Sequence, residues 1–111
     1  MTDLVSFADF TKLDMRVGTI AKVEVPSGSA HVYRLTIDFG KETGERIIFS
    51  GLKQTHEVKD LEGKQAVFVV NLEPKKVMGE ESQGMLLAVD YKSKPVMIIP
   101  EERVDDGAKA H

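Results

Sequence analysis

The amino-acid sequence predicts a mainly β protein, a small barrel of five short strands with little helix. Apolar and polar residues alternate over residues 17–25 and 33–39, as expected for strands with one buried face. Two further apolar runs, 66–70 and 85–89, are expected to form buried strands, and 66–70 is apolar on both faces, as is typical of a central strand. A chain of 111 residues suffices for one core and is too short for two. We therefore expect a single domain over residues 1–111.

A short helix is expected at the N-terminus. Ser6 is followed three residues later by Asp9, which is the spacing of a helix-capping box. Phe7, Phe10 and Leu13 recur at helical spacing. We expect one or two turns of helix whose apolar side chains close one end of the core. The alternative is a surface helix anchored by the two phenylalanines.

The first two strands are expected to form a hairpin around the turn residues 26–29. In the first strand, Gly18 indicates a bulge or a sharp bend. The residues expected on the same face of this strand are Val17, Thr19, Ala21, Val23 and Val25. In the second strand the corresponding residues are Tyr33, Leu35, Ile37 and Phe39.

The third strand is expected at residues 46–50, after a turn at 40–44. No strand periodicity follows until residue 65, and residues 53–60 are expected to form one or two helical turns. A short apolar run at 96–99 closes the pattern with a terminal hairpin. The polar tail, 101–111, is expected to be partly ordered unless another segment docks it.

This order of elements, three strands, a helical piece and two more strands, is that of the OB-fold, a five-stranded Greek-key barrel. An SH3-like barrel is the alternative. OB-folds bind oligonucleotides and oligosaccharides on one face and at the loops that join strands one–two and four–five. Residues 71–85 fall at the four–five loop and are more numerous than a turn requires. We therefore expect this connection to hold the ligand.

The charge and composition of the chain exclude several classes of function. The net charge of −3 argues against a surface coated in basic residues, although it allows a local basic patch. The chain has no cysteine, which removes disulfides and thiolate chemistry. It shows neither a signal-peptide pattern nor an apolar run long enough to cross a membrane, so we expect a cytoplasmic protein that does not contact membranes.

Catalytic chemistry is not indicated. His31, His56 and His111 are scattered without the spacing of metal ligands or catalytic bases. The acidic pairs, such as Glu80–Glu81, have the character of solvated surface, and no glycine-rich phosphate loop precedes a helix. We expect a binding protein that is not an enzyme and has no metal or cofactor.

Three segments carry a family resemblance: residues 9–20 (DFTKLDMRVGTI), 49–52 (FSGL) and 71–85 (NLEPKKVMGEESQGM). In this order and spacing they resemble the tRNA-binding domain family, over about residues 7–107. Members occur alone and as modules of methionyl-tRNA and phenylalanyl-tRNA synthetases. The resemblance implies an OB-fold that holds tRNA by shape, chiefly near its elbow, without reading the anticodon.

The resemblance also implies partners. Free-standing members are homodimers built from segments flanking the barrel, and the apolar run 96–99 is a further reason to expect a dimer. Assistance to an aminoacyl-tRNA synthetase in trans is another expectation. The CsaA-type chaperones are similar, so an export chaperone that binds unfolded peptide is the alternative function. The Ser82-x-Gly84-Met85 ending resembles the synthetase-appended branch, whereas Glu80 and Glu81 depart from the pattern and are expected to reduce affinity for RNA.

The 71–85 connection supplies most candidate RNA contacts. Lys75 and Lys76 are suited to phosphates, which they would position without reading sequence, although lysine pairs are commonly just solvated surface. Asn71 is suited to a base edge or ribose hydroxyl, or to capping a turn. Ser82 is suited to phosphate or to the loop backbone.

Two methionines and three residues elsewhere complete the candidates. Met78 is suited to packing on a base or ribose, whereas Met85 heads an apolar strand and is expected mainly in the core. Secondary candidates are Ser50 and Lys53 at the third-strand exit and Arg34 on the polar face of the second strand.

Overall fold

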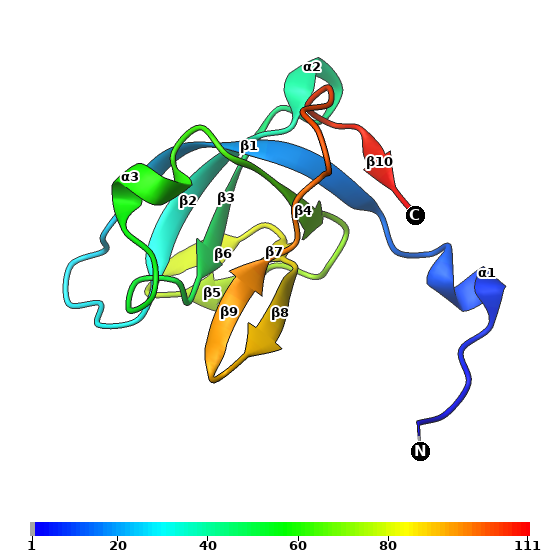
Figure 1. Cartoon of the computed structure of the whole chain (residues 1–111), viewed down its shortest axis with the longest axis horizontal. Coiled ribbons are helices and arrows are strands. Elements are labelled where there is room, and N and C mark those ends of the chain that lie inside the picture. The colour runs from blue at the N-terminus through cyan, green and yellow to red at the C-terminus, as the bar shows by residue number, and fades with distance from the viewer. Residues whose placement is uncertain (1) are drawn as a thin grey trace.

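The structure is a computed structural model, and it describes residues 2–111. Five antiparallel strands form a nearly closed barrel in the order β3-β2-β1-β4-β7 (Figure 1). Their bounds are β1 Met15–Glu24, β2 Tyr33–Asp38, β3 Glu45–Ser50, β4 Gln65–Val69 and β7 Met85–Leu86. The predicted five-stranded OB barrel is confirmed.

Three short helices lie between these strands and before them. They are α1 Phe7–Phe10, α2 Gly40–Thr43 and α3 Val58–Leu61. The Ser6 side chain accepts a hydrogen bond from the Asp9 amide at 3.0 Å, so the predicted cap of α1 is confirmed. Helix α3 lies between β3 and β4 as predicted, and α2 occupies the connection that was expected to be a plain turn.

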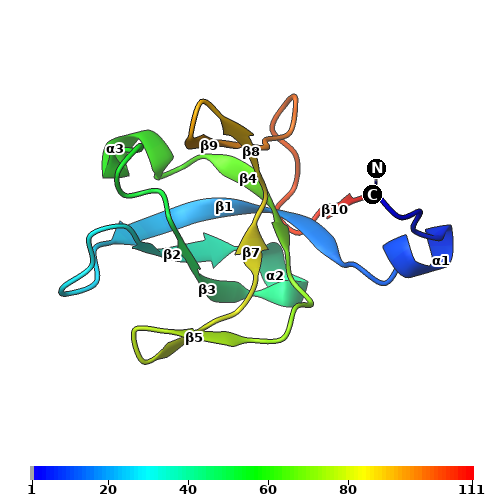
Figure 2. The same cartoon turned by 90° about the horizontal axis from the view of Figure 1, so that it is seen from below.

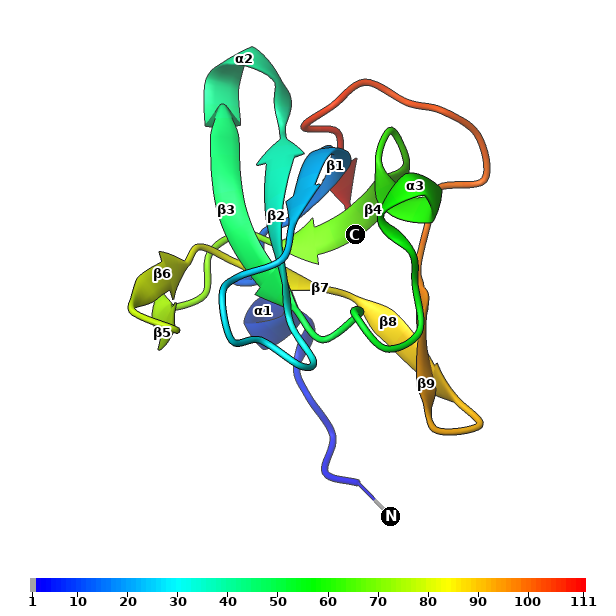
Figure 3. The same cartoon turned by 90° about the vertical axis from the view of Figure 1, so that its left-hand side faces the viewer.

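Two hairpins extend the last third of the chain. The lysine hairpin, residues 75–82, consists of β5 Lys75–Val77 and β6 Glu80–Ser82. The apolar hairpin, residues 88–97, consists of β8 Ala88–Tyr91 and β9 Lys94–Met97. They lie on opposite sides of the barrel (Figures 2 and 3).

The predicted alternation along β1 is wrong beyond Thr19. Ile20 and Val23 are buried, whereas Ala21 is exposed. The pairing of β1 with β2 shifts register between Ile20 and Lys22, so Ala21 is the extra residue of a bulge. This bulge, rather than Gly18, is where the strand deviates.

Gly18 serves close packing. A Cβ atom at this position would lie 2.5 Å from Ile37 Cγ2 and 2.8 Å from the Phe39 ring. Phe39 in turn meets Phe68 edge to face, with ring centroids 5.4 Å apart. The core is therefore closely packed against β1 at this point, and any side chain at position 18 would displace Ile37 or Phe39. The largest fully buried side chains are Phe39, Phe68, Ile20, Leu35, Ile37, Ile48, Leu52 and Leu61.

The expectation that the N-terminal helix closes the core is wrong. Helix α1 projects from the barrel (Figure 1), and the side chain of Phe7 is 79% exposed. Phe10 and Leu13 are also more than a third exposed. The helical periodicity was read correctly, but the barrel is already filled by its own strands. The apolar face of α1 is therefore only partly covered by the described part of this chain.

The C-terminal tail is docked by β1. Its strand β10, Lys109–Ala110, pairs with Met15 and Arg16 at the start of β1. Upstream, the buried Gln65 side chain donates to the Val104 carbonyl at 2.6 Å and accepts from the Val104 amide at 3.0 Å. The tail therefore satisfies a buried polar group and extends the sheet.

Candidate functional site

The lysine hairpin turns through the two residues Met78 and Gly79, whose φ angles are 52° and 86°. Two residues with positive φ form the type I′ turn that matches the twist of paired strands. Gly79 fits this geometry without strain, whereas methionine rarely adopts it. The turn presents Met78, 53% exposed, at the tip of the hairpin.

The two lysines point to opposite faces of the hairpin. Lys75 pairs with Ser82 and Lys76 pairs with Glu81, and side chains of directly paired residues lie on the same face. Ser82 is buried against the barrel, so Lys75 is on the barrel side and Lys76 on the outer side. Both lysines are exposed, and neither forms an ion pair within residues 2–111. One hairpin can therefore offer cations to two separate phosphates.

The base of the lysine hairpin is joined to the edge of β3. The buried Ser82 hydroxyl accepts from the Phe49 amide at 3.0 Å. The Gln83 side-chain oxygen accepts from the Ile47 amide at 2.9 Å, and the backbone amide of Gln83 donates to the Ile47 carbonyl at 2.8 Å. The Ser82 hydroxyl thus accepts from the backbone of β3, whereas the expected partners were a phosphate or the backbone of the loop itself. Gln83 was missed, although it lies inside the same motif.

Near its tip, the hairpin is held by Arg34 of β2. The guanidinium donates to both oxygens of Glu80, Nε at 2.7 Å and Nη2 at 2.8 Å, and to Glu24 of β1 at 2.6 Å. The hydrogen bonds to Glu80 raise the pKa of Arg34, and Arg34 lowers the pKa of the Glu80 carboxyl. Arg34 therefore forms ion pairs with two carboxylates, those of Glu24 and Glu80, and is not a free cation.

The same contacts change the interpretation of the two glutamates. Glu80 turns back onto Arg34, so its charge is balanced within the protein. Glu81 faces outward beside Lys76 and is exposed. The two acids therefore differ: Glu80 is paired with Arg34 on the barrel side, and Glu81 is exposed on the outer face.

Asn71 joins the 71–85 connection to the segment before β1. Its Oδ1 accepts from the Asp14 amide at 2.8 Å, and its Nδ2 donates to the Lys12 carbonyl at 2.6 Å. Both ends of the amide are therefore used by backbone 57 and 59 residues away. This is a long-range tie rather than the local turn cap that was considered.

The remaining candidates lie outside the hairpin, at the start of β7 and at the exit of β3. Met85 is 48% exposed, so the expectation that it lies mainly in the core is wrong; its neighbour Leu86 takes that place. Ser50 ends β3 opposite Tyr33. Lys53 donates through Nζ to the Ser29 carbonyl at 2.5 Å, which ties the β3 exit to the β1–β2 loop.

Arg46 was also missed. Its guanidinium donates to the Val70 carbonyl and, at 3.4 Å, to the Gln83 carbonyl, so it links the end of β4 to the base of the hairpin. Within residues 2–111, no three His, Cys, Asp or Glu side chains are grouped to hold a metal ion. The arrangement offers exposed cations and an exposed thioether on a braced ribbon.

Comparison with known proteins decides the family. The model of the tRNA_bind family, "Putative tRNA binding domain", matches residues 15–109. The chain belongs to this family. The match includes β1, the third-strand exit and the whole lysine hairpin, so the family resemblance of the sequence is confirmed.

Relatives and solved structures agree with the assignment. The chain is 41% identical over 110 residues to the methionine–tRNA ligase of Methanococcoides burtonii, covering 98% of this chain and 16% of the ligase. A MetRS-related protein from Pyrococcus horikoshii superposes with a TM-score of 0.90 at 37% identity, over 99% of this chain and all of that one. The chaperone CsaA of Bacillus anthracis superposes with a TM-score of 0.88 at 32% identity, over 98% and 100%.

The chain thus spans about one sixth of the length of that ligase. In residues 2–111 no helix is both long enough and apolar enough to cross a membrane.

Proposed function

We propose that this protein is a binding module that holds tRNA by shape and catalyses no reaction. Family membership supports an RNA ligand. The observation that carries the proposal is the lysine hairpin, a ribbon braced at both ends that exposes cations on each face. The single functional unit extends over about residues 7–107. The cytoplasm, where tRNA is found, is the proposed location.

Each candidate residue has a distinct part in this proposal. Lys75 and Lys76 bind phosphates on either side of the hairpin, and Met78 packs on a ribose or base. Met85, Ser50 and Lys53 border the approach to the hairpin and make secondary contacts. Three candidates form hydrogen bonds within the protein and therefore act by shaping the site: Asn71, Ser82 and Arg34.

The decisive experiment measures binding of bulk tRNA by gel shift or fluorescence anisotropy over a range of salt concentrations. We expect Lys75→Ala/Lys76→Ala to weaken binding about tenfold or more at low salt, and to reduce the salt slope by about 2, because two phosphate contacts are lost. The matched control is Lys92→Ala/Lys94→Ala, which removes the same charge from the apolar hairpin and should leave tRNA affinity within about twofold. Absence of tRNA binding by the wild type at low salt would refute the proposal.

Peptide binding is the second candidate, because the fold superposes on a chaperone CsaA and the apolar hairpin exposes Val89, Tyr91 and Val96. Apolar contacts and main-chain pairing respond weakly to salt, whereas phosphate contacts respond strongly. Titration with an extended apolar peptide at low and moderate salt separates the two functions. Salt-insensitive peptide binding without any tRNA binding would favour the chaperone function.

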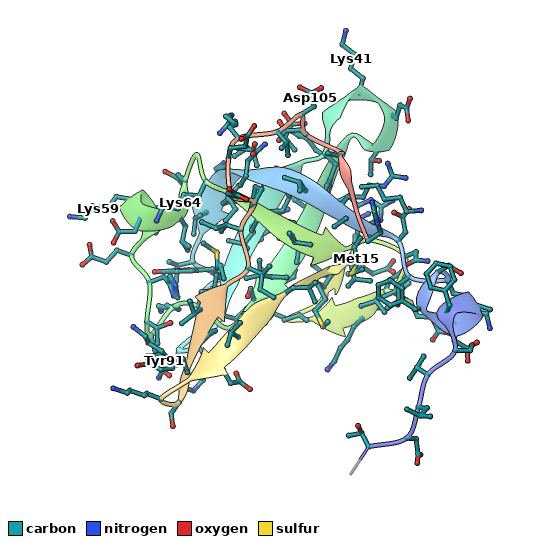
Figure 4. The ribbon with its side chains drawn as sticks, turned by 45° about the vertical axis from the view of Figure 1, so that its right-hand side comes forward. Met15, Lys41, Lys59, Lys64, Tyr91 and Asp105 are labelled. Atoms are coloured by element: carbon teal, nitrogen blue, oxygen red, sulfur yellow. The ribbon has the colours of Figure 1, made fainter. Side chains whose placement is uncertain are left out.

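We also propose a homodimer. The N-terminal apolar face consists of Leu4, Val5, Phe7, Phe10 and Leu13, all more than a third exposed. It borders a cavity of about 320 Å³ between α1 and the C-terminal residues Lys109–His111. Met15, at the start of β1, lines the same cavity, and Figure 4 shows it between the barrel and α1. Apolar patches of this extent on a small protein are usually covered by a partner.

Light scattering tests the dimer directly. We expect a dimer at micromolar concentration for the wild type and a monomer for Phe7→Ser/Phe10→Ser. The substituted side chains are outside the core, so the circular dichroism of the barrel should not change. A monomeric wild type would contradict the proposal. A dimer would present two lysine hairpins to one tRNA and so raise the avidity of binding. We propose an aminoacyl-tRNA synthetase, assisted in trans, as a further partner.

A further inference from the structure

The lysine hairpin contains only three residues in each strand. A two-stranded ribbon of this size is marginally stable alone in water, so its position depends on what fastens it. Ser82 and Gln83 fasten the base to β3. At the other end of β6, the first residue after the turn is Glu80, and its fastening is the two-oxygen contact with Arg34.

Arg34 is itself fixed by the barrel. It lies near the start of β2 and is paired on both sides, with Glu24 opposite on β1 and Phe49 opposite on β3. Glu24 accepts from Arg34 Nη1 at 2.6 Å, and Lys22 lies 3.6 Å from the other Glu24 oxygen. Glu24 therefore holds the guanidinium through Nη1, and the Nε and Nη2 atoms remain to donate to Glu80. Two parallel N–H···O bonds fix orientation as well as distance.

We propose that Glu80 is a positioning residue for RNA binding. Its carboxylate, gripped by Arg34, holds the tip of the lysine hairpin in the orientation that presents Lys75, Lys76 and Met78. Glu80 therefore raises affinity for RNA although its charge is negative. The inference rests on the proposed tRNA binding and explains how a family member tolerates an acid at this position.

The proposal makes a prediction of opposite sign to simple electrostatics. If Glu80 acted only through its charge, its neutralisation would strengthen binding of a polyanion. If it acts through Arg34, neutralisation removes the charge-assisted pair, the tip moves, and the lysines lose their common geometry. The neighbouring Glu81 is the matched control, because it carries the same charge on the outer face of the same strand and does not contact Arg34.

The experiment compares tRNA affinity of Glu80→Gln and Glu81→Gln with the wild type. We expect Glu80→Gln to bind about fivefold more weakly, and Glu81→Gln to bind equally or more tightly. Arg34→Gln should also weaken binding, and the double variant Arg34→Gln/Glu80→Gln should be no weaker than the worse single variant, because both changes break one contact. Tighter binding by Glu80→Gln, or additive losses in the double variant, would overturn the inference.

Amide hydrogen exchange supplies a readout that does not depend on RNA. In Glu80→Gln the amides of residues 75–82 should exchange several-fold faster, while those of β1, β2 and β4 keep their protection. If the wild type binds tRNA and Glu80→Gln binds equally well, the positioning role alone is wrong. If the wild type does not bind tRNA, both proposals are wrong, and faster exchange would then identify Glu80 as a tether of the fold only.

Discussion

The lysine hairpin and the apolar hairpin share a backbone design but differ in how the barrel holds them. Both turn through two residues with positive φ, Met78–Gly79 in the first and Lys92–Ser93 in the second. The lysine hairpin is fastened mainly by side chains, those of Ser82, Gln83 and Glu80, together with one backbone bond from the Gln83 amide to the Ile47 carbonyl. The apolar hairpin instead continues the barrel through backbone bonds.

Those backbone hydrogen bonds join Val67 of β4 to Leu87 and Ile98, the residues on either side of the apolar hairpin. The Leu87 amide donates to the Val67 carbonyl at 3.0 Å, the Val67 amide to the Ile98 carbonyl at 3.0 Å, and the Ile98 amide to the Leu87 carbonyl at 3.1 Å. Met97 packs against the core from the inner face. Side-chain fastening leaves a hairpin adjustable by single substitutions, whereas backbone fastening makes it part of the sheet.

The outer surfaces differ as well. On the apolar hairpin, Val89 pairs with Val96, and Tyr91 lies two residues farther along the same face. Tyr91 is near the free end of the hairpin (Figure 4) and half exposed, with the Lys92 ammonium 5.2 Å from its ring centroid. One hairpin therefore offers cations to a polyanion, and the other offers an apolar strip to a protein partner.

The largest expected effect concerns the base of the lysine hairpin. A Cβ atom at Gly84 would lie 2.7 Å from the Val69 carbonyl oxygen and 3.0 Å from Ile48 Cδ1. We expect Gly84→Ala to lower the free energy of unfolding by about 2–4 kcal/mol, because backbone and core must both move. Gly79→Ala at the tip meets open space and should cost only about 1 kcal/mol, from its positive φ. Urea denaturation measures both, and equal costs would contradict a rigidly held base.

The second prediction separates the functions of the two hairpins. Val89→Thr/Val96→Thr keeps β-branched side chains but makes the exposed strip polar. Val96 begins the apolar run 96–99, the other feature on which the dimer is based, so we expect the dissociation constant of the proposed dimer to rise about tenfold. The matched control, Asp90→Asn on the opposite face, should leave it unchanged. Analytical ultracentrifugation measures the constant, and an unaltered value would place the dimer contact on the N-terminal apolar face alone.

A third, smaller effect concerns the two tips. Ser93 has a φ angle of 64°, which costs a non-glycine residue about 1 kcal/mol, so Ser93→Gly should raise the free energy of unfolding by about that amount. Met78→Gly should stabilise the protein similarly, but it should also weaken tRNA binding because the exposed thioether is lost. Thermal unfolding and tRNA titration of both variants test this contrast. A loss of tRNA affinity in Ser93→Gly would show that the tips are not functionally distinct.

The barrel could be predicted from the sequence because its signals are local. Strand alternation, the doubly apolar run of β4 and the non-periodic stretch before it each follow from neighbouring residues. The bulge at Ala21 was not predictable, because it is set by the register against β2. The exposure of Phe7 was missed for a related reason: periodicity identifies an apolar face but not what covers it.

In the candidate site too, features set by neighbouring residues could be predicted, whereas contacts between distant residues could not. The exposure of the two lysines follows from the motif alone, whereas the hairpin with its turn at Met78–Gly79 was not predicted. The contacts of Glu80 with Arg34, 46 residues apart, and of Asn71 with Asp14, 57 residues apart, depend on the closed barrel. Sequence reasoning could therefore name the polar residues of the loop. It could not distinguish those that face a ligand from those that fasten the loop.

The smallest expected effect is a dependence on pH that only the lysine hairpin should show. Arg34 lowers the pKa of Glu80 below its ordinary 4.5, so the stability that their contact contributes is present above pH 4.5 and is lost as the pH falls through the lowered pKa. Amide exchange in residues 75–82 should therefore accelerate below pH 4.5, relative to the intrinsic rate, before the barrel unfolds. In Arg34→Gln this acceleration should be absent, since Glu80 has already lost its partner. Parallel acceleration in the apolar hairpin would mean that acid loosens the sheet as a whole, and that side-chain fastening does not set the two hairpins apart.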